Sequence, residues 1–468
     1  MSRVTGADLL GLARDALSSA GEPEVEVVVR NATRGFARFA MGDLGQHMAL
    51  LEPQVLVRVA GGARRSSVAQ VATNRLDKES IVRAIHEAAK AALRVPETEG
   101  FVGFAAAGED MKSRPSRFAP ATAAMDAEGR ADRVAKALGA ITHAGLFGAG
   151  ALETRVTSLA VATTRGRFVS HDGTAAQFKV WALETPGAGG AAGYGGAVHR
   201  DVEALDLDAE TERAIRICRM SKEPTSLEAG TYDVVMEPPA VAELVEWLAT
   251  IAFSALSIEQ GTSALRGRIG ERITGDSITM TEAPLDDGPF GLAAPFDREG
   301  TWRRNVPLIE RGIAMGVLHD RASATRANVA STGSALLPDG IGDAGIGASS
   351  IYVDGGSAES VEELIAGVTR GLFVCRLHYV NGLLDPRRAV MTGLTRDGCF
   401  LIENGRIARP VGNLRFTDSF LDALARSDGM TKGRHAVPTG WSDAGAHVVP
   451  SIRMRGFRFN GQSQESLR

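Results

Sequence analysis

The sequence predicts an α+β protein with an N-terminal mixed α/β domain of short strands and flanking helices, and a C-terminal β-rich domain. Three observations predict this class. The chain has 468 residues, 44% hydrophobic and 23% charged, which is typical of a globular protein with two or three domains. Its 54 glycines follow no short period, which favours strands joined by tight turns. Runs of β-forming residues also lie between amphipathic segments with helix caps.

The N-terminal segment predicts a helix over residues 5–19, which Thr5 caps and Gly21 ends. Asp8, Arg14 and Asp15 interrupt its apolar residues, so we interpret the segment as an amphipathic helix and not as a signal peptide. Four β-like runs follow, over residues 25–30, 35–41, 54–60 and 67–73.

The rest of the first half alternates between helices and strands. Helices are predicted over 78–94 after Asp77, over 127–144 after Asp126, and over 208–220. Three strands are expected at 155–163, 167–172 and 175–185, with Asp172-Gly173 as the turn between the last two. The glycine-rich residues 187–196 do not open a helix, so we interpret them as a flexible or bulged loop and not as a phosphate-binding loop.

The polar, turn-rich stretch 221–230 predicts a domain boundary, which gives domains of residues 1–222 and 223–468. A strand over 231–238 and a helix over 239–256 open the second domain. On this helix Glu243, Glu246 and Thr250 fall opposite the apolar face, so we expect a solvated face there. The apolar face consists of Val241, Leu244, Val245, Leu248 and Ala252.

Two similar segments predict hairpins in the second domain. LIERGIA at 308–314 and LIENGRIA at 401–408 both read as strand–turn–strand, and Asn404-Gly405 is a strong turn signal. They are explained either by internal pseudo-symmetry or by convergence on one turn. A helix over 361–370, with a capping box of Ser360 and Glu363, separates them.

Charge and cysteine content exclude several classes of protein. The net charge of −4 argues against nucleic acid as the main partner. The three cysteines, Cys218, Cys375 and Cys399, are far apart, which indicates a reducing compartment and no disulfide framework. The longest apolar stretch, 240–256, contains two glutamates and is shorter than the ~20 residues of a membrane span, so we expect no membrane partner.

The residues alone provide no self-contained catalytic motif. No two histidines lie one helical turn apart, and Lys90 stands where a second histidine would complete a zinc motif begun by His86-Glu87. No nucleophile elbow is present. Cys375 and His378 are three residues apart on a predicted strand and therefore point to opposite faces.

From residue 256 onward the chain resembles the TldD/PmbA (TldE) family, long described as modulators of DNA gyrase and regarded as zinc metallopeptidases. Long collinear segments carry the resemblance: GTSALRGRIGERI at 261–273, APFDREGT at 294–301, VPLIERGIAMGVLHDRASATRANVASTG at 306–333, SAESVEELIAGVTRGLFV at 357–374, TGLTRDGCFLIENGRIARPVGNLRF at 392–416 and IRMRGFRFNG at 452–461. NATRGFARF at 31–39 is compatible with it.

The resemblance implies a zinc site that this sequence lacks. TldD-type chains carry HExxxH on a helix before the GTS segment, and a distal cysteine completes the site. Here the motif falls at 246–251, where Glu246 stands at the first histidine position, Trp247 at the glutamate and Ile251 at the second histidine. His435 lies near the position of the cysteine. We therefore expect no catalytic residue and no metal in this chain, and a solvated helix face at Glu246.

The chain accordingly looks like the PmbA/TldE type, which the resemblance pairs with a TldD-type subunit that holds the zinc. This implies a heterodimeric cytoplasmic peptidase for unfolded or modified peptides, in which the present chain shapes the chamber and binds substrate. Extended peptide could bind by strand addition. In the segment 318–333, His319, Arg321, Ser331 and Thr332 are the candidate substrate contacts. The alternative is that this segment is a structural connection.

Two other functions stay open from the sequence. One is a catalytically competent peptidase with a divergent metal site that uses Glu246, His319 or His435. The other is a non-proteolytic modulator that acts on a protein target. Whether the chain is itself an enzyme is therefore undecided at this stage.

Overall fold

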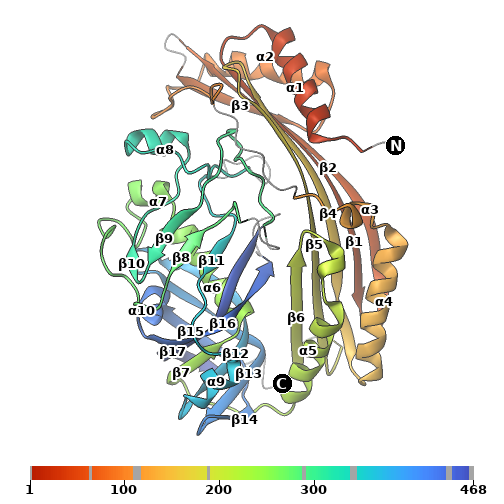
Figure 1. The fold of residues 1–468 in the computed structure, drawn as a ribbon, viewed down its shortest axis with the longest axis vertical. Helices are drawn as coiled ribbons and strands as arrows, with labels where there is room; N and C mark the ends of the chain where they lie inside the picture. Colours follow the sequence, from red (N-terminus) through yellow and green to blue (C-terminus); the bar gives the residue numbers. More distant parts are fainter. Residues whose placement is uncertain are drawn as a thin grey trace.

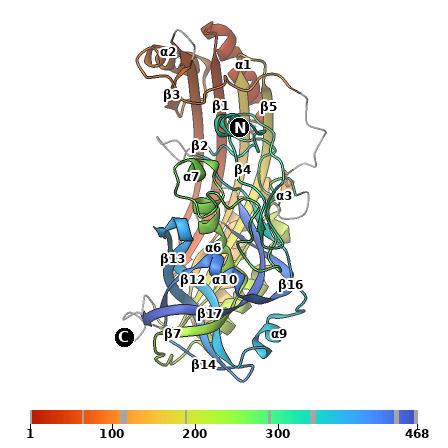
Figure 2. The same ribbon diagram turned by 90° about the vertical axis from the view of Figure 1, so that its left-hand side faces the viewer.

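The computed structural model describes residues 3–62, 66–108, 117–186, 190–286, 291–337, 345–438 and 445–462. It contains two large β-sheets, one in each half of the chain (Figure 1). Helices cover one face of the first sheet, and the second half of the chain lies against the other face. In the view turned by 90° the second domain stands in front of the long strands of the first sheet (Figure 2). The predicted α+β class with N-terminal and C-terminal domains is confirmed.

The first sheet has six strands in the order β3-β2-β1-β4-β5-β6, and all neighbours are antiparallel. Its strands are β1 (Val25–Ala40), β2 (Asp43–Gly61), β3 (Ser67–Thr73), β4 (Phe147–Thr163), β5 (Phe168–Leu183) and β6 (Ala192–His199).

These strands are longer than the short strands that the sequence predicts. The predicted runs 25–30 and 35–41 are one strand, because the residues between them pair with both β2 and β4. The chain instead turns at Met41 and Gly42, which have φ of 54° and 94°. The predicted turn at Asp172-Gly173 is also wrong, since β5 runs through it and the turn lies at Gly166, with φ of 86°. Asp172 instead accepts hydrogen bonds from the Gly6 amide and the Ser158 hydroxyl.

The glycine-rich stretch 187–196 also differs from the prediction. Residues 187–189 lie outside the described residues, and the loop interpretation fails for 192–196, which are part of β6. Glycine suits this strand because helix α5 (Leu207–Met220) crosses it closely. A Cβ on Gly193 would lie 2.1 Å from the Ala214 carbonyl oxygen, and one on Gly195 would lie 2.1 Å from that of Glu210.

The helices over the first sheet begin at the predicted caps. Thr5 and Asp8 form a capping box on α1 (Gly6–Ala20), and Asp77 and Asp126 cap α2 (Lys78–Ala92) and α4 (Ala127–His143). The apolar faces of α1 and α2 pack on one part of the sheet, and those of α4 and α5 pack on another. The remaining elements of this half are α3 (Pro120–Ala124), η1 (Val202–Ala204) and α5 (Leu207–Met220).

The second sheet has eleven strands in the order β10-β9-β8-β11-β17-β15-β13-β12-β7, with β14 beside β13 and β16 beside β17. Because β17 also pairs with β7, strands β17, β15, β13, β12 and β7 close into a ring. The strands are β7 (Gly230–Met236), β8 (Met280–Glu282), β9 (Val306–Glu310), β10 (Ile313–Ala314), β11 (Ile351–Val353), β12 (Arg370–Asp385), β13 (Val390–Glu403), β14 (Arg406–Pro410), β15 (Leu414–Ser419), β16 (Ser427–Pro438) and β17 (Ala446–Gln462).

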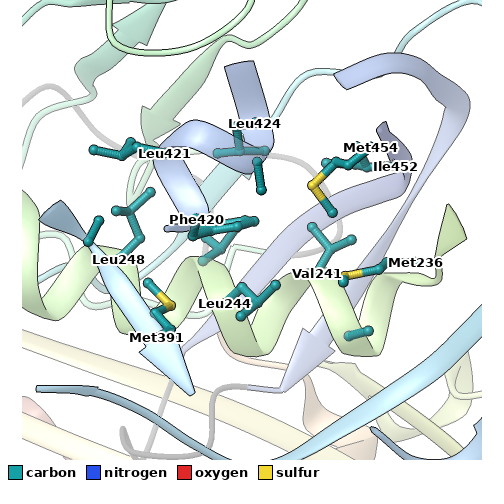
Figure 3. Close-up of a cluster of buried hydrophobic side chains, with 14 of the residues drawn as sticks. Met236, Val241, Leu244, Leu248, Met391, Phe420, Leu421, Leu424, Ile452 and Met454 are labelled. Carbon is teal, nitrogen blue, oxygen red and sulfur yellow. The ribbon is translucent and has the colours of Figure 1, made fainter. Parts of the chain in front are cut away.

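Helix α6 (Pro238–Ala252) packs its apolar face against this ring and ends four residues before the predicted end at 256. Leu244 and Leu248 are 1% and 0% exposed and belong to one buried cluster with Phe420, Met391 and Met454 (Figure 3). The shorter helices of this half are α7 (Ala255–Glu259), α8 (Arg321–Arg326), η2 (Pro386–Arg388), α9 (Val361–Ala366) and α10 (Phe420–Ala425).

Both predicted hairpins form, as β9–β10 and β13–β14. Each turn has two residues with positive φ, Arg311-Gly312 and Asn404-Gly405, as two-residue hairpins require. The predicted capping box at Ser360 does not form, because the Glu363 carboxylate accepts from the Glu359 amide and the Ser360 side chain makes no cap bond.

The chain passes between the sheets after Met220, where α5 ends, and before Gly230, where β7 begins. The domain limit after residue 222 stays a prediction. No helix in the described part of the chain is long and apolar enough to cross a membrane.

Candidate functional site between the two sheets

The polar face of α6 is directed toward the first sheet and not toward solvent. Glu246 is only 8% exposed, and Glu243 is half-buried, so the predicted solvated face is wrong for both residues. The physical reason is that strands of the second sheet pack on α6, and that Lys179 of the first sheet lies close enough for its charge to interact with both carboxylates. Of the three polar residues on this face, Thr250 alone is exposed.

Strand β5 presents a cation to this face of α6. Phe178 and Val180 are buried under the helices of the first domain, so the alternation of a strand directs Lys179 to the opposite face of the sheet. Burial lowers the pKa of Lys179, and the charge of Arg376 lowers it further, whereas Glu153, Glu246 and Glu243 act in the other direction. Burial raises the pKa of Glu243, and the positive charges of Arg376 and Lys179 act to lower it. We call Lys179, Glu243, Glu246 and Arg376 the inter-sheet charge cluster.

Arg376 of β12 also fastens the two sheets together. Its guanidinium forms an ion pair with the Asp397 carboxylate and lies 5.4 Å and 4.9 Å from the ring centroids of Trp181 and Tyr194. The Trp181 indole donates to the same carboxylate over 3.0 Å. Arg376 and Asp397 belong to the second sheet, and the two aromatic rings belong to the first.

A local irregularity of β13 positions Asp397. Asp397 and Gly398 have φ of 53° and 121°, and the pairing of β12 with β13 shifts register there. Such a bulge re-aims a side chain that regular pleating would direct elsewhere. Gly398 is required because a Cβ on it would lie 2.8 Å from the Cys375 sulfur.

His435 lies at the other end of α6 from Glu246. It sits on β16 opposite Val449, and burial and then the charge of Arg213 lower its pKa, while Glu237 acts in the other direction. Glu237 is the N-cap of α6 and is ion-paired with Arg213 at 2.5 Å. Because Glu246 lies nine residues further along the helix, the Glu237 and Glu246 residues are separated by about 14 Å of helix axis.

The other two positions of the degenerate motif belong to the core. Trp247 packs against the core of the second domain and closely approaches Gly382 of β12, where an added Cβ would lie 2.9 Å from the indole. Ile251 is 4% exposed and is also part of that core. Both side chains are therefore used in packing.

The structure brings His319, Ser331 and Thr332 together around the carbonyl group of His319, and Arg321 bonds elsewhere. The hydroxyls of Ser331 and Thr332 both donate to the His319 carbonyl oxygen, over 3.1 Å and 2.9 Å, and the His319 amide donates to the Thr332 hydroxyl. The His319 ring lies 3.2 Å from the Ser323 hydroxyl. These bonds hold the ends of the segment together, as a structural connection would.

Arg321 belongs to a buried ionic network between the domains. Its amide donates to Glu299, and its guanidinium donates to the Gly103 carbonyl of the first domain. Glu299 also accepts from Arg58 of β2 at 3.3 Å, and Arg58 forms a second ion pair with Glu26 at 2.6 Å. Glu26 and Glu299 are both buried.

Residues 229–461 match the family model of the PmbA/TldA metallopeptidase C-terminal domain. The chain belongs to the TldD/PmbA family. It is 28% identical to a metalloprotease of Methanothermobacter thermautotrophicus over 292 aligned residues. The aligned part is 60% of this chain and 60% of that one. It is 22% identical over 241 residues to a zinc metalloprotease TldD homolog of Saccharolobus solfataricus, covering 49% of this chain and 53% of that one. The chain thus matches 60% or less of the length of these relatives.

Solved structures of this family share the fold over nearly the whole chain. TldE from Thermococcus kodakarensis superposes with a TM-score of 0.84 at 19% identity, covering 96% of this chain and 99% of that chain. A Thermotoga maritima protein described as a modulator of a DNA gyrase superposes with a TM-score of 0.82 at 19% identity, covering 97% and 99%.

The zinc that the Saccharolobus solfataricus relative is named for does not fit the motif positions of this chain. Among Glu246, Trp247 and Ile251 only the glutamate is a metal ligand, and its charge acts on the Lys179 ammonium. The charges that act on the pKa of His435 come from Arg213 and from Glu237 at the N-terminal end of α6. Within the described ranges, no group of three His, Cys, Asp or Glu side chains is placed to hold a metal ion.

Sequence patterns did not predict the roles of Lys179, Arg376, Asp397 or the Arg58 network. A signal was present, since Lys179 and Arg376 are single charges inside the otherwise apolar strands QFKVWAL and FVCRLHYV. Charged residues at such positions are rarely buried unless they are paired. Which groups pair them depends on contacts across two domains, and these have no local pattern.

Proposed function

We propose that this chain is a TldE-like, non-catalytic subunit of a cytoplasmic zinc metallopeptidase that cleaves unfolded or modified peptides. The observation that carries the proposal is the inter-sheet charge cluster. Where a TldD-type chain would place two histidines and a glutamate, α6 has one carboxylate, Glu246, whose charge acts on the Lys179 ammonium. A nearby cation repels a divalent metal ion, and one carboxylate does not replace three ligands.

In this proposal the zinc belongs to a TldD-type partner subunit, and the present chain binds substrate and completes the peptidase. Three free, buried cysteines support a reducing compartment. Substrate contacts through His319, Arg321, Ser331 and Thr332 stay a prediction, and the bonds among these residues favour a structural role for the two hydroxyls. Binding of extended peptide by strand addition would give little sequence selectivity.

Zinc content and peptidase activity test the proposal. The purified chain is expected to hold less than about a tenth of an equivalent of zinc and to cleave no unfolded casein. Addition of the TldD-type subunit from the same organism is expected to produce zinc-dependent cleavage. Cleavage by the TldD-type subunit alone at the full rate of the mixture would contradict a role for this chain.

The second candidate, a peptidase with its own divergent metal site, gives a different result in the same experiment. The chain alone would then hold about one equivalent of zinc and would lose it in the Glu246→Gln and His435→Ala variants. His86→Ala is the matched control because this histidine is exposed on α2. Full zinc occupancy that survives both site substitutions would contradict both candidates and place the metal elsewhere.

A further inference from the structure

A row of arginines lies on the face of the first sheet that is turned toward the second domain. On β1, Val28 belongs to one buried cluster with Phe296 of the second domain, so the even-numbered residues of this strand face that domain. Three arginines of β1 have this orientation, and one arginine of β4 lies directly opposite the second of them. We call these four residues the arginine row: Arg30, Arg34, Arg38 and Arg155.

The arginine row makes this part of the face cationic. From Arg30 to Arg38, the even-numbered residues of β1 and their partners on β2 and β4 include four arginines and two carboxylates, Glu52 and Glu153. The whole chain has 52 basic and 56 acidic residues, so this excess of cations is local. Arg34 and Arg155 face each other across the strand pair, and like charges directly opposite destabilise a sheet. Such a departure from local stability is typical of a functional site.

The side chain of Arg34 is held in place over the sheet. Its guanidinium lies 2.6 Å from the Glu153 carboxylate, which is also 3.4 Å from the guanidinium of Arg155. The Arg34 guanidinium lies 5.7 Å from the ring centroid of Phe36. A guanidinium has five N–H donors, so a bond to Glu153 is compatible with a bond to a second carboxylate. These contacts fix Arg34 in position before a ligand arrives, which lowers the entropy cost of binding.

The arginine row becomes more open toward Arg38. The side chain of Arg155 is 6% exposed and that of Arg34 is 36% exposed, whereas Arg38 is an exposed residue. Met48, which lies opposite Phe36 on β2, is 44% exposed. Strands β13 and β16 of the second sheet pack on β6, at the edge of the first sheet away from β2. A ligand can therefore reach the arginine row from its Arg38 end.

We propose that the arginine row binds the acidic side chains of an extended peptide. The inference names a substrate class for the proposed function and therefore rests on that function. Successive arginines of β1 are four residues apart, which is about 13 Å along a strand. An extended peptide that runs along β1 thus matches them with acidic residues at every fourth position. Phe36 and Met48 lie between Arg34 and Arg38 and suit an apolar side chain of the same peptide.

A nucleic acid fits this surface less well than an acidic peptide. Proteins bind single strands by combining cationic grooves with aromatic rings on which the bases stack. Phe36 is the aromatic residue of this part of the face, and it is half-buried with the Arg34 guanidinium over its ring. The arginine row therefore supplies positive charge without an open surface for stacking.

Fluorescence anisotropy of a labelled peptide, with the full chain and no other subunit, tests the proposal. The probe has about ten residues, of which half are glutamate and the rest alanine and proline, so that it stays extended. A second probe has lysine in place of each glutamate. We expect the chain to bind the glutamate peptide at least about tenfold more tightly than the lysine peptide, and added sodium chloride to weaken this binding.

Two variants test whether the arginine row carries the binding. Arg34→Gln/Arg38→Gln is expected to weaken it by about tenfold, and Glu153 keeps Arg155 as a partner in this variant. Arg38→Glu changes one exposed residue and is expected to weaken binding with an unchanged circular dichroism spectrum. Arg83→Gln is the matched control, because Arg83 is exposed on α2, which packs on the other face of the sheet, and it should bind like the wild type.

Several results would overturn the proposal. These are equal binding of the two peptides, no binding of either, full binding by Arg38→Glu, or displacement of the glutamate peptide by an equal concentration of oligothymidylate. Because this assay uses no TldD-type subunit, its result is separate from that of the casein assay. Zinc-dependent casein cleavage by the mixture without a preference for the glutamate peptide would overturn only this inference. A preference without cleavage would overturn only the proposed function.

Discussion

The buried histidine on β17 gives the molecule a specific sensitivity to acid. His447 is 2% exposed, its Nδ1 accepts from the Ile351 amide over 3.2 Å, and burial lowers its pKa to about 4. In the unfolded chain its pKa is about 6.5. The unfolded state therefore binds a proton between these values and the folded state does not, so stability falls as the pH is lowered from 6.5 toward 4.

We expect this residue to remove about 2 kcal/mol of unfolding free energy between pH 7 and pH 5. His447→Asn keeps an acceptor near the position of Nδ1 and does not titrate, so its urea unfolding free energy should change less over that range. His86→Asn on the exposed face of α2 is the control and should follow the wild type. Equal slopes for His447→Asn and wild type would contradict the assignment.

Among the residues of the inter-sheet contact, Arg376 is the one whose substitution should lower the unfolding free energy most. Its removal leaves the Asp397 carboxylate, 7% exposed, with only the Trp181 indole and the more distant Arg396 as partners. An uncompensated buried charge costs about 3–5 kcal/mol, so Arg376→Ala should lower the unfolding free energy in urea by that amount. Arg396→Ala is the matched control, because Arg396 lies 3.9 Å from the same carboxylate and is 39% exposed, and it should cost less than about 1 kcal/mol.

The starts of helices with capping residues were predictable from the sequence. Boundaries that depend on tertiary contacts were not. Thr5, Asp77 and Asp126 cap helices where predicted, because a cap needs only residues next to it in the chain. Asp172-Gly173 has the composition of a turn but lies inside β5, because its neighbours pair with β4 on one side and the aspartate bonds to α1. Tertiary contacts override local preference there.

The same distinction explains the candidate site. The absence of the zinc motif was visible in the sequence, since it concerns residue types at fixed spacing. The environment of Glu246 was not, because a helix in an α+β protein normally has one solvated face, and only the position of the first sheet removes it. Lys179 and Arg376 come from strands 197 residues apart, so their proximity has no local signature.

Helix α6 is held in place by its apolar face, so truncation of a side chain on that face should destabilise the protein. Leu248 is fully buried among the residues of the ring (Figure 3), so Leu248→Ala removes transfer free energy and leaves a cavity. We expect a loss of about 2–5 kcal/mol in urea unfolding, against less than about 0.5 kcal/mol for the exposed Thr250→Ala on the same helix. A loss below 1 kcal/mol for Leu248→Ala would mean that α6 does not depend on this packing.

At the scale of the whole molecule, several contacts join the halves of the chain, and two of them differ in chemistry. The Arg376 contact combines an ion pair with two aromatic rings, and the Arg58 network combines Glu26 of β1, Arg58 of β2 and Glu299 of the second domain. Burial raises the pKa of Glu26, which Arg58 opposes. Because the Arg58 network is ionic and buried, neutralising one of its three members should lower the unfolding free energy more than neutralising all three.

This comparison provides a test of how the domains are coupled. Arg58→Met leaves Glu26 and Glu299 buried without their shared cation, and should lower the unfolding free energy by about 3–5 kcal/mol. The triple variant Glu26→Gln/Arg58→Met/Glu299→Gln leaves no charge of this network uncompensated and should recover part of that loss. Scanning calorimetry should then give two separated transitions for Arg58→Met and closer ones for the triple variant. Lys136→Ala, which breaks an exposed ion pair with Asp208, should change neither, because such pairs contribute little. A single unshifted transition for Arg58→Met would mean that the other contacts between the two halves, among them those of Arg376 and Arg213, couple them without this network.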